Sequence, residues 1–342
     1  MEFVIGELAK NWLAELLFFL RRDLLALSHY LFDATKRLYW GYLIGALLIA
    51  AWGYWRVIQT PFTRTGFWQY LFPRTIYRHP SVRHDVALLV LNLFIRSAIW
   101  LPLVFTVVPI ALLLSQGLES IAGPPMALAW PAWLITFSFT ALLFVLDDLS
   151  RYWLHRMLHN VPFLWDYHKV HHSAPVLTPL TIYRTHPVES YLYGCRMALA
   201  QGVAIAIGYQ LFAEQLRAYE ILEANVFVFV FNLCGSNLRH SHIWISWGTC
   251  LERWFISPAQ HQLHHSTAAA HRNCNFGSAL AIWDRWGGSL VVAQQAAGQP
   301  LSFGCAGSAD HQNIVGLYWQ PLKDNSKRIR AWLRKWASVI RR

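Results

Sequence analysis

The sequence predicts an all-α integral membrane protein, with about four to six transmembrane or re-entrant helices and a histidine-rich helical cap on the cytosolic side. Of the 342 residues, 55% are hydrophobic and only 14% are charged, whereas soluble domains carry about 25% charged residues. Long apolar runs recur along the chain, and twelve of the 16 histidines lie between positions 155 and 271. This composition excludes a disordered chain, a disulfide scaffold and a pair of soluble domains.

Residues 1–38 are predicted to form an amphipathic or interfacial N-terminal segment. Charges are too frequent in the stretch from Trp12 to Leu27 for a transmembrane span, so we expect it to lie in the membrane surface or on the protein's own surface. The segment has no basic region before an apolar core, unlike a cleaved signal peptide.

Residues 39–125 are predicted to form membrane helices. The run from Tyr39 to Ile58 is nearly uncharged and has Trp and Tyr at both ends, which is typical of a transmembrane helix with its aromatic belts. The run from Val86 to Leu114 contains Arg96 and two prolines, which favours either one kinked helix or two short crossings.

Residues 126–295 contain three further apolar runs and most of the histidines. The first run, Met126 to Leu146, ends at two aspartates. The runs Tyr191 to Phe212 and Tyr219 to Cys234 then fit a hairpin that returns to the side it left. Residues 296–342 are predicted to be a basic cytosolic tail.

The basic residues predict the topology. Lys and Arg exceed Asp and Glu by 29 − 18 = 11, and they cluster between apolar runs, as the positive-inside rule and anionic lipids require. Because no basic stripe stands apart from these flanks, nucleic acid is not an expected partner. We expect the segments Arg64 to Arg83, Arg151 to Arg184 and everything after Arg239 on the cytoplasmic face, in a bacterial inner membrane rather than the endoplasmic reticulum. That topology places residues 1–38 on the opposite side, although their own basic residues disfavour it.

The histidines form three clusters with helical spacing. His155 and His159 are four residues apart and share one face of a helix. The pattern HxxHH occurs at 168–172 and again at 261–265. A lone histidine is usually structural, but three such clusters beside membrane spans predict a metal site. The eight imidazoles belong to His155, His159, His168, His171, His172, His261, His264 and His265.

The number of imidazoles predicts two ions. With His240 or His242 the set reaches at least nine donors, more than the roughly six that one ion accepts. Imidazole suits iron, zinc, copper and nickel, so the ligands alone do not choose the metal. A closed structural zinc uses four donors, and the surplus favours a catalytic site with open positions. The five cysteines form no CxxC pair, which argues against zinc ribbons, redox dithiols and iron–sulfur clusters.

Over about residues 130–290 the order of motifs resembles the fatty acid hydroxylase/sterol desaturase superfamily. The motifs are DxxxxxxHxxxH at 148–159, HxxHH at 168–172, RTHPVE at 184–189, NLRHSH at 237–242, HxxHH at 261–265, NFG at 275–277 and WDR at 283–285.

The resemblance implies that residues 126–295 are a catalytic domain of a membrane-bound, O2-dependent, non-haem di-iron oxidoreductase. Its substrate would be a lipid: a sterol, a fatty acyl chain, an ether lipid or an aminolipid. Hydroxylation is the first expectation and desaturation the second. Two iron ions are implied, with zinc able to replace them. The implied ligands are the eight motif histidines and His240.

Five further residues are candidates for an additional ligand or for orienting the imidazoles. His242 stands where the family's HSN-like step has Asn, but residues two apart diverge on a helix, so His240 is preferred to His242. His186 precedes Pro187, which disfavours helical geometry there. Acids that orient metal-binding imidazoles complete the set: Asp148, Glu189 and Asp284. His271 is expected at the surface, and His29, His79, His84 and His311 are expected to be structural.

Two other features bear on the reaction. No GxGxxG fingerprint is present, so electrons are expected from a separate ferredoxin- or cytochrome-like donor docked on the arginine-rich face.

A non-enzymatic metal or haem protein is the competing class. A transporter would place its ionisable ligands within the spans, and a haem needs only paired ligands, which would leave most of these histidines unexplained.

Overall fold

The computed structural model describes residues 27–57, 63–96, 106–221, 223–296, 300–305 and 313–340, together with residues 21, 25 and 298. These residues are mostly α-helical. The predicted interfacial helix from Trp12 to Leu27 lies outside the described residues, apart from three positions, and His311 lies outside them as well.

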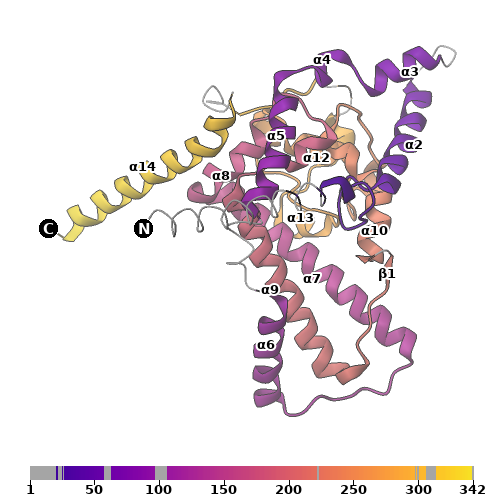
Figure 1. The fold of residues 1–342 in the computed structure, drawn as a ribbon, viewed down its shortest axis with the longest axis vertical. Coiled ribbons are helices and arrows are strands. Elements are labelled where there is room, and N and C mark those ends of the chain that lie inside the picture. Colours follow the sequence, from indigo (N-terminus) through magenta and orange to yellow (C-terminus); the bar gives the residue numbers. More distant parts are fainter. Residues whose placement is uncertain are drawn as a thin grey trace, which may run out of the picture.

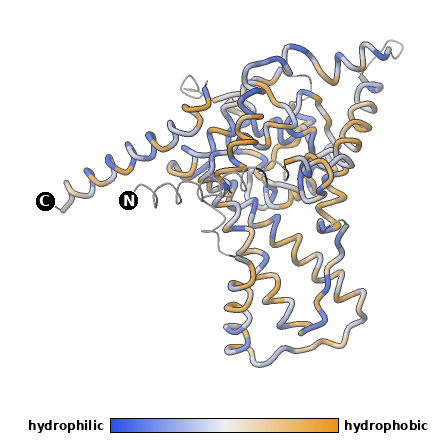
Figure 2. Tube along the Cα trace, in the orientation of Figure 1, coloured by the Kyte–Doolittle hydropathy of each residue, from blue (hydrophilic) through white to orange (hydrophobic). Residues whose placement is uncertain are grey.

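Three helices form a bundle that projects from a compact cap (Figure 1). Helices α6 (Val107–Ala122) and α7 (Ala132–Asn160) pack on α9 (Pro187–Phe212). Two helical stretches, Ala132–Asn160 and Pro187–Gln215, are long and apolar enough to cross a membrane, and α6 is a shorter apolar helix. Figure 2 shows apolar residues along this bundle, and Leu113 and Ile121 are 70% and 86% exposed. The bundle therefore presents a surface suited to lipid.

Small residues on α9 let both neighbours approach closely. Gly202 lies against α6, where an added Cβ would be 2.5 Å from Ile110 Cγ2. Gly208 lies against α7, where an added Cβ would be 2.8 Å from the ring of Phe139. Close contact through small side chains is typical of helices packed within membranes, so α9 is held between its two partners by shape.

The return of the chain differs from the predicted hairpin. The run from Tyr219 to Cys234 is not one helix, because strand β1 (Glu220–Ile221) turns back onto β2 (Ala224–Asn225) before α10 (Val226–Leu233) begins. Glu223 in the turn has a φ of 66°, and Asn225 caps α10 by accepting the Phe227 N–H. An eight-residue helix spans about 12 Å, well short of the roughly 30 Å hydrocarbon layer. The chain nevertheless returns to the cap.

The cap gathers the three segments predicted to share one face. Four helices begin with proline in the first turn, a position where the missing N–H costs nothing: α5 (Pro80–Ile95), α8 (Pro162–His172), α9 and α12 (Pro258–His264). The other cap elements are α3 (Arg64–Leu71), α4 (Arg74–Tyr77), α11 (Gly248–Leu251) and α13 (Ile282–Gly287), with the 3-10 helices η2 (Pro179–Tyr183), η4 (Ser236–His240), η5 (Ala269–His271) and η6 (Ala293–Ala296). A further 3-10 turn, η3 (Ala213–Gln215), follows α9.

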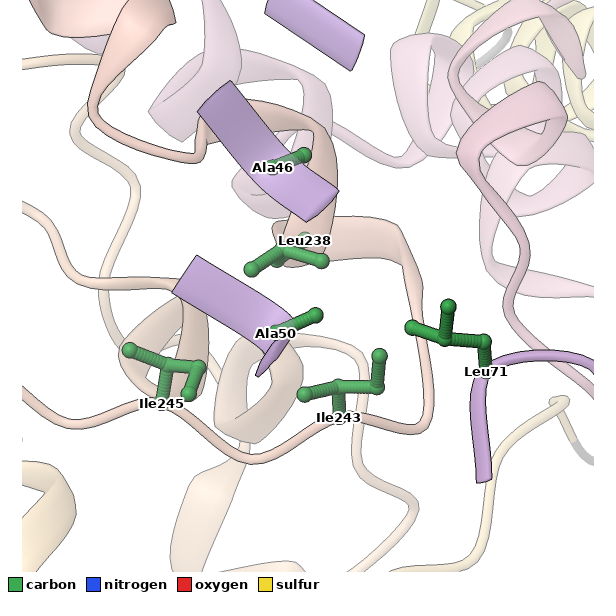
Figure 3. Close-up of a cluster of buried hydrophobic side chains, with 6 residues drawn as sticks. All are labelled: Ala46, Ala50, Leu71, Leu238, Ile243 and Ile245. Carbon is green, nitrogen blue, oxygen red and sulfur yellow. The ribbon is translucent and has the colours of Figure 1, made fainter. Parts of the chain in front are cut away.

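The run from Tyr39 to Ile58, which was predicted to span the membrane, forms helix α2 (Trp40–Val57), and this helix lies along the cap (Figure 1). Helix α2 is not one of the two described helices that are long and apolar enough to cross a membrane. Figure 3 shows the contact: Ala46 and Ala50 of α2 form one buried cluster with Leu71, Leu238, Ile243 and Ile245. Just before α2, the Arg37 guanidinium donates to Asn232 and Ser236 beside η4. Arg37 therefore lies next to the cap, and the side of the membrane on which residues 1–38 lie stays a prediction.

Two other runs show where the helices begin and end. The run from Val86 to Leu114 contains two helices, α5 and α6, which fits the second of the two expected arrangements, while their crossing of the membrane stays a prediction. Helix α7 starts at Ala132 because Met126 and Leu128 donate their backbone N–H groups to the end of α9. It then continues past Asp148 to Asn160, which carries the first histidine pair from the bundle into the cap.

The predicted basic tail is largely one helix, α14 (Ile314–Ile340), which packs on α8 and then projects from the cap (Figure 1).

We expect Gly202→Leu to lower stability by about 1–3 kcal/mol, because the new side chain overlaps α6. Gly117→Leu is the matched control, since an added Cβ at Gly117 meets nothing within 4 Å. Thermal unfolding of the detergent-solubilised protein measures both. Equal melting temperatures for the two variants would contradict this account of the α6–α9 contact.

Candidate metal centre

Four elements bring the nine histidines together inside the cap. His155 and His159 lie on α7, His168, His171 and His172 on α8, His240 at the end of η4, and His261 and His264 on α12, with His265 as the C-cap of α12. They form two groups, and within each group the candidate ligand atoms lie within 4.8 Å of one another. The first group is His155, His159, His168, His172 and His264, and the second is His171, His240, His261 and His265.

Each HxxHH motif contributes to both groups. In α8 the i, i+4 pair His168 and His172 joins the first group, and His171 joins the second. In α12 the i, i+4 pair His261 and His265 joins the second group, and His264 joins the first. Around a helix, residue i+4 is rotated by about 40° from residue i in one direction, whereas residue i+3 is rotated from it in the opposite direction. The two groups therefore adjoin, and the rings of His172 and His265 stack with centroids 4.4 Å apart.

The first group fits a metal ion by its unpaired nitrogens. The Nδ1 atoms of His155 and His264 donate to the carbonyls of Phe276 and Cys274, both at 2.7 Å, and His168 Nδ1 donates to Glu189 Oε1 at 2.9 Å. These bonds leave a lone pair on each Nε2. The Nε2 atoms without a hydrogen-bond partner are those of His159, His168, His172 and His264. Buried lone pairs without donors are costly, and a shared cation would satisfy them.

The second group fits a metal ion because hydrogen bonds cannot satisfy it. His240 Nε2 lies 3.2 Å from His171 Nε2 and 3.1 Å from His261 Nε2, and His261 Nε2 lies 3.3 Å from His265 Nε2. A neutral imidazole Nε2 offers either one N–H or one lone pair, so His240 can serve only one of its two neighbours. Nitrogens bound at about 2.1 Å to one ion are about 3.0–3.4 Å apart, which matches these distances.

Burial keeps these imidazoles neutral. Desolvation lowers the pKa of His171 to about 3. It also lowers the pKa of every other group member on α8, η4 and α12 well below the ordinary value, and the neighbouring histidines add to the effect. Metal binding requires the neutral ring, so at neutral pH no proton competes for these nitrogens.

The three predicted acids act at different distances from the imidazoles. Glu189, in the first turn of α9, holds His168 directly. Asp148 accepts from Ala279 N, Leu280 N and Trp283 Nε1, so it fixes the loop that includes the NFG motif.

Asp284 accepts from the backbone of Phe276 and Gly277 and from Ser289. Because Phe276 supplies the carbonyl that holds His155, Asp148 and Asp284 orient that imidazole through the backbone.

The structure places His186 and His242 outside both groups. His186 caps α9 by accepting the Val188 N–H at Nδ1, and its Nε2 donates to the Tyr318 carbonyl; burial lowers its pKa to about 4. His242 Nε2 donates to the Tyr70 carbonyl at 2.6 Å. His240, the preferred residue of the pair, is the one that joins the second group.

Sequence reasoning placed His271 at the surface, and this was wrong. His271 is buried at the end of η5 although its neighbours Ala270 and Arg272 are exposed, so this 3-10 turn directs one side chain inward from an otherwise exposed segment.

Sequence reasoning missed a buried ion pair that supports the second group. Arg184 is fully buried, and its Nη1 pairs with Asp85 Oδ1 at 3.0 Å. Its carbonyl accepts the His171 Nδ1–H at 3.3 Å. The available signal was Asp85 itself, an acid at the start of a long apolar run, where an unpaired charge would be costly.

Comparisons with known proteins agree with this centre. Residues 140–289 match the family model described as fatty acid hydroxylase. The Delta(7)-sterol 5(6)-desaturase ERG3B of Gibberella zeae is 34% identical over 151 residues, which cover 44% of this chain and 41% of that protein. The ornithine lipid hydroxylase OlsE of Rhizobium tropici is 28% identical over 46% of this chain and 43% of its own. The alkylglycerol monooxygenase of Xenopus tropicalis is 27% identical over 45% of this chain and 31% of its own.

The alignments therefore span less than half the length of these relatives. No solved structure matches the chain significantly. The resemblance to the fatty acid hydroxylase/sterol desaturase superfamily is confirmed, and it lies in the segment that carries the histidines.

We expect the purified protein to hold about two metal ions per chain, because nine donors exceed the roughly six that one ion accepts. His172→Ala and His261→Ala each remove a donor from one group and should lower the metal content. His242→Ala is the matched control, since His242 faces Tyr70. Elemental mass spectrometry measures all four proteins. A single ion in the unaltered protein, or an equal loss in the control, would overturn the two-group assignment.

Glu189→Ala should weaken metal affinity by about 10–100-fold, because the carboxylate that orients His168 is lost. Competition with a chelator, followed by metal release, measures the affinity. Glu119→Ala removes an exposed acid from α6 and should leave it unchanged. An unaltered affinity in the Glu189 variant would contradict the orienting role.

Proposed function

We propose that this chain, which carries a fatty acid hydroxylase domain, is a membrane-bound, O2-dependent di-iron enzyme that hydroxylates a lipid at an unactivated C–H bond. The observation that carries the proposal is the pair of adjoining histidine groups, one of five and one of four imidazoles. Closed structural sites use four donors for one ion, whereas this cap concentrates nine neutral imidazoles for two.

The chain's own residues would perform three tasks in the reaction. The two histidine groups would hold the ions, and bound iron would supply O2 activation and redox chemistry. Glu189 and the carbonyls of Phe276 and Cys274 would fix the tautomer and direction of the rings they contact. The buried cap would exclude water from the centre. Zinc is expected to replace iron on overexpression, because imidazole accepts both metals.

The proposal of a lipid substrate rests on the bundle and on the relatives. Helices α7 and α9 both run from the apolar bundle into the cap, and they carry His155, His159 and Glu189. An alkyl chain among these helices would therefore have a short path to the imidazoles. The relatives' names refer to a sterol, an ornithine lipid and an alkylglycerol. These names support a lipid as the class and leave the particular lipid open among sterols, fatty acyl chains, ether lipids and aminolipids.

Desaturation is the second candidate reaction. It is favoured by the 34% identity to a sterol desaturase over the segment with the histidines. Both reactions need the same histidines and remove a hydrogen from carbon, so this arrangement of residues supports either one.

Electrons are proposed to come from a separate ferredoxin- or cytochrome-like protein. The sequence has no dinucleotide fingerprint, and its cysteines lack the spacing of an iron–sulfur site. We place the centre on the cytoplasmic face of a bacterial inner membrane, where basic loops are retained.

We expect His261→Ala to abolish product formation in membranes, because His261 contributes to the second group. His29→Ala is the control, since His29 is exposed and lies outside every motif, and it should retain nearly full activity. Lipid extracts of cells with each variant are compared by mass spectrometry. A gain of one oxygen identifies hydroxylation, and a loss of two hydrogens identifies desaturation.

Full activity of the His261 variant would refute its role as a ligand. An optical spectrum of the purified protein provides a second test, because a strong Soret band would show haem and overturn the non-haem proposal.

A further inference from the structure

The C-terminal helix α14 has two halves with different surroundings. Its first half packs on the cap: Leu317 is buried with Leu88 and Val170, and Asn325 Nδ2 donates to the Phe163 carbonyl at 2.9 Å. Two ion pairs tie it to α8, Asp324 with Lys169 and Arg328 with Asp166. Beyond Arg328 the helix continues away from the body, across the direction of α6 and α9 in Figure 1.

The second half carries an apolar stripe that stays exposed. Ile329, Trp332, Leu333 and Trp336 are spaced by three, one and three residues, so they share one face of the helix. Their exposed fractions are 47%, 59%, 47% and 57%. The rings of Trp332 and Trp336 stack on one another. Figure 2 shows hydrophobic and hydrophilic residues alternating along this helix, as expected where one face is apolar and the other charged.

The opposite face is strongly basic. From Lys327 to Ile340 the sequence contains five Lys or Arg residues and no Asp or Glu. Lys327, Arg330 and Arg334 follow one another at three- and four-residue intervals, so they share one face of the helix. Because Arg330 and Arg334 each precede a tryptophan by two residues, this face is turned away from Trp332 and Trp336. A tryptophan-rich face joined to a basic face is the composition of helices that lie in the headgroup region of a membrane.

We propose that the segment Lys327–Ile340 of α14 lies flat in the headgroup layer of a membrane that contains anionic lipids. The apolar stripe would enter the boundary of the acyl chains, and the basic side chains would reach anionic phosphates. An acidic protein would match the charge but leave the two tryptophans without an apolar environment. A second copy of this segment would bring five cations against five.

This placement would also fix the metal centre relative to the membrane. Helix α14 is tied by its ion pairs to α8, which carries His168, His171 and His172. In the view of Figure 1, the free end of α14 reaches the height at which α9 meets the cap. The segment would thus hold the cap at the membrane surface from the side, independently of the bundle.

Fluorescence of the full-length protein in nanodiscs tests the proposal. Leu333→Cys places a label on the apolar stripe, and Ala331→Cys places one on the opposite exposed face as the matched control. Both are made in a background without the five native cysteines and labelled with an environment-sensitive dye. The discs contain phosphatidylcholine alone, or with one-third phosphatidylglycerol, and carry doxyl-labelled lipids as quenchers. Thermal unfolding verifies that each variant is folded.

We expect the label at position 333 to shift to the blue and to be quenched at least twofold more in discs with phosphatidylglycerol, while the label at 331 stays in water. Replacing Lys327, Arg330 and Arg334 together by Gln should remove the effect of phosphatidylglycerol. Equal, lipid-independent emission at both positions would overturn the proposal. Burial of position 333 only on addition of an acidic redox protein, or only at protein concentrations that form dimers, would overturn it as well.

Discussion

A buried imidazole needs a partner for each of its two ring nitrogens, and this requirement organises the cap. Nine imidazoles turn one nitrogen toward two adjoining centres, so the partners for the other nitrogens must come from the surrounding chain. The carbonyls of Phe276, Cys274 and Arg184 and the carboxylate of Glu189 supply several of them. The inward nitrogens cannot satisfy one another, because a neutral Nε2 has a single hydrogen or a single lone pair. A cation in each group removes that conflict.

The partners of the imidazoles are themselves held by residues elsewhere in the chain, so the geometry of the metal centre depends on the whole fold. Asp148 on α7 accepts three bonds from residues 279–283, and Asp284 secures the backbone that holds His155. Glu189 lies in the first turn of α9, so the helix that runs from the cap into the bundle also carries a partner of His168. Because α7 and α9 each continue from apolar bundle to polar cap, the position of the centre relative to lipid is set by continuous helices.

The spacing of the histidines predicted the helical segments of α7, α8 and α12 and the residues that gather there, because helical periodicity is a local property. How each HxxHH motif divides between two groups was not predictable, since it depends on how α8 and α12 face one another. The helix expected over Tyr219 to Cys234 was wrong, because hydropathy cannot register a turn built on Glu223 and a cap at Asn225. Helix α14 was not predicted, because the segment was interpreted from its high charge as a basic tail. The apolar stripe becomes visible only when its residues are placed at helical spacing. His271 was misplaced because its environment is formed by tertiary contacts.

Because each HxxHH motif is divided between the two groups, a movement of the helix that carries it affects both groups. If each helix served one group, α8 or α12 could move with a single ion and leave the other in place. Here a shift of α8 displaces His168 and His172 in the first group and His171 in the second. A shift of α12 displaces one histidine of the first group and two of the second. A movement of α8 or of α12 therefore distorts both groups together. Since α8 also carries the ion pairs to α14, the element that couples the two groups is the same element that the C-terminal helix holds from outside.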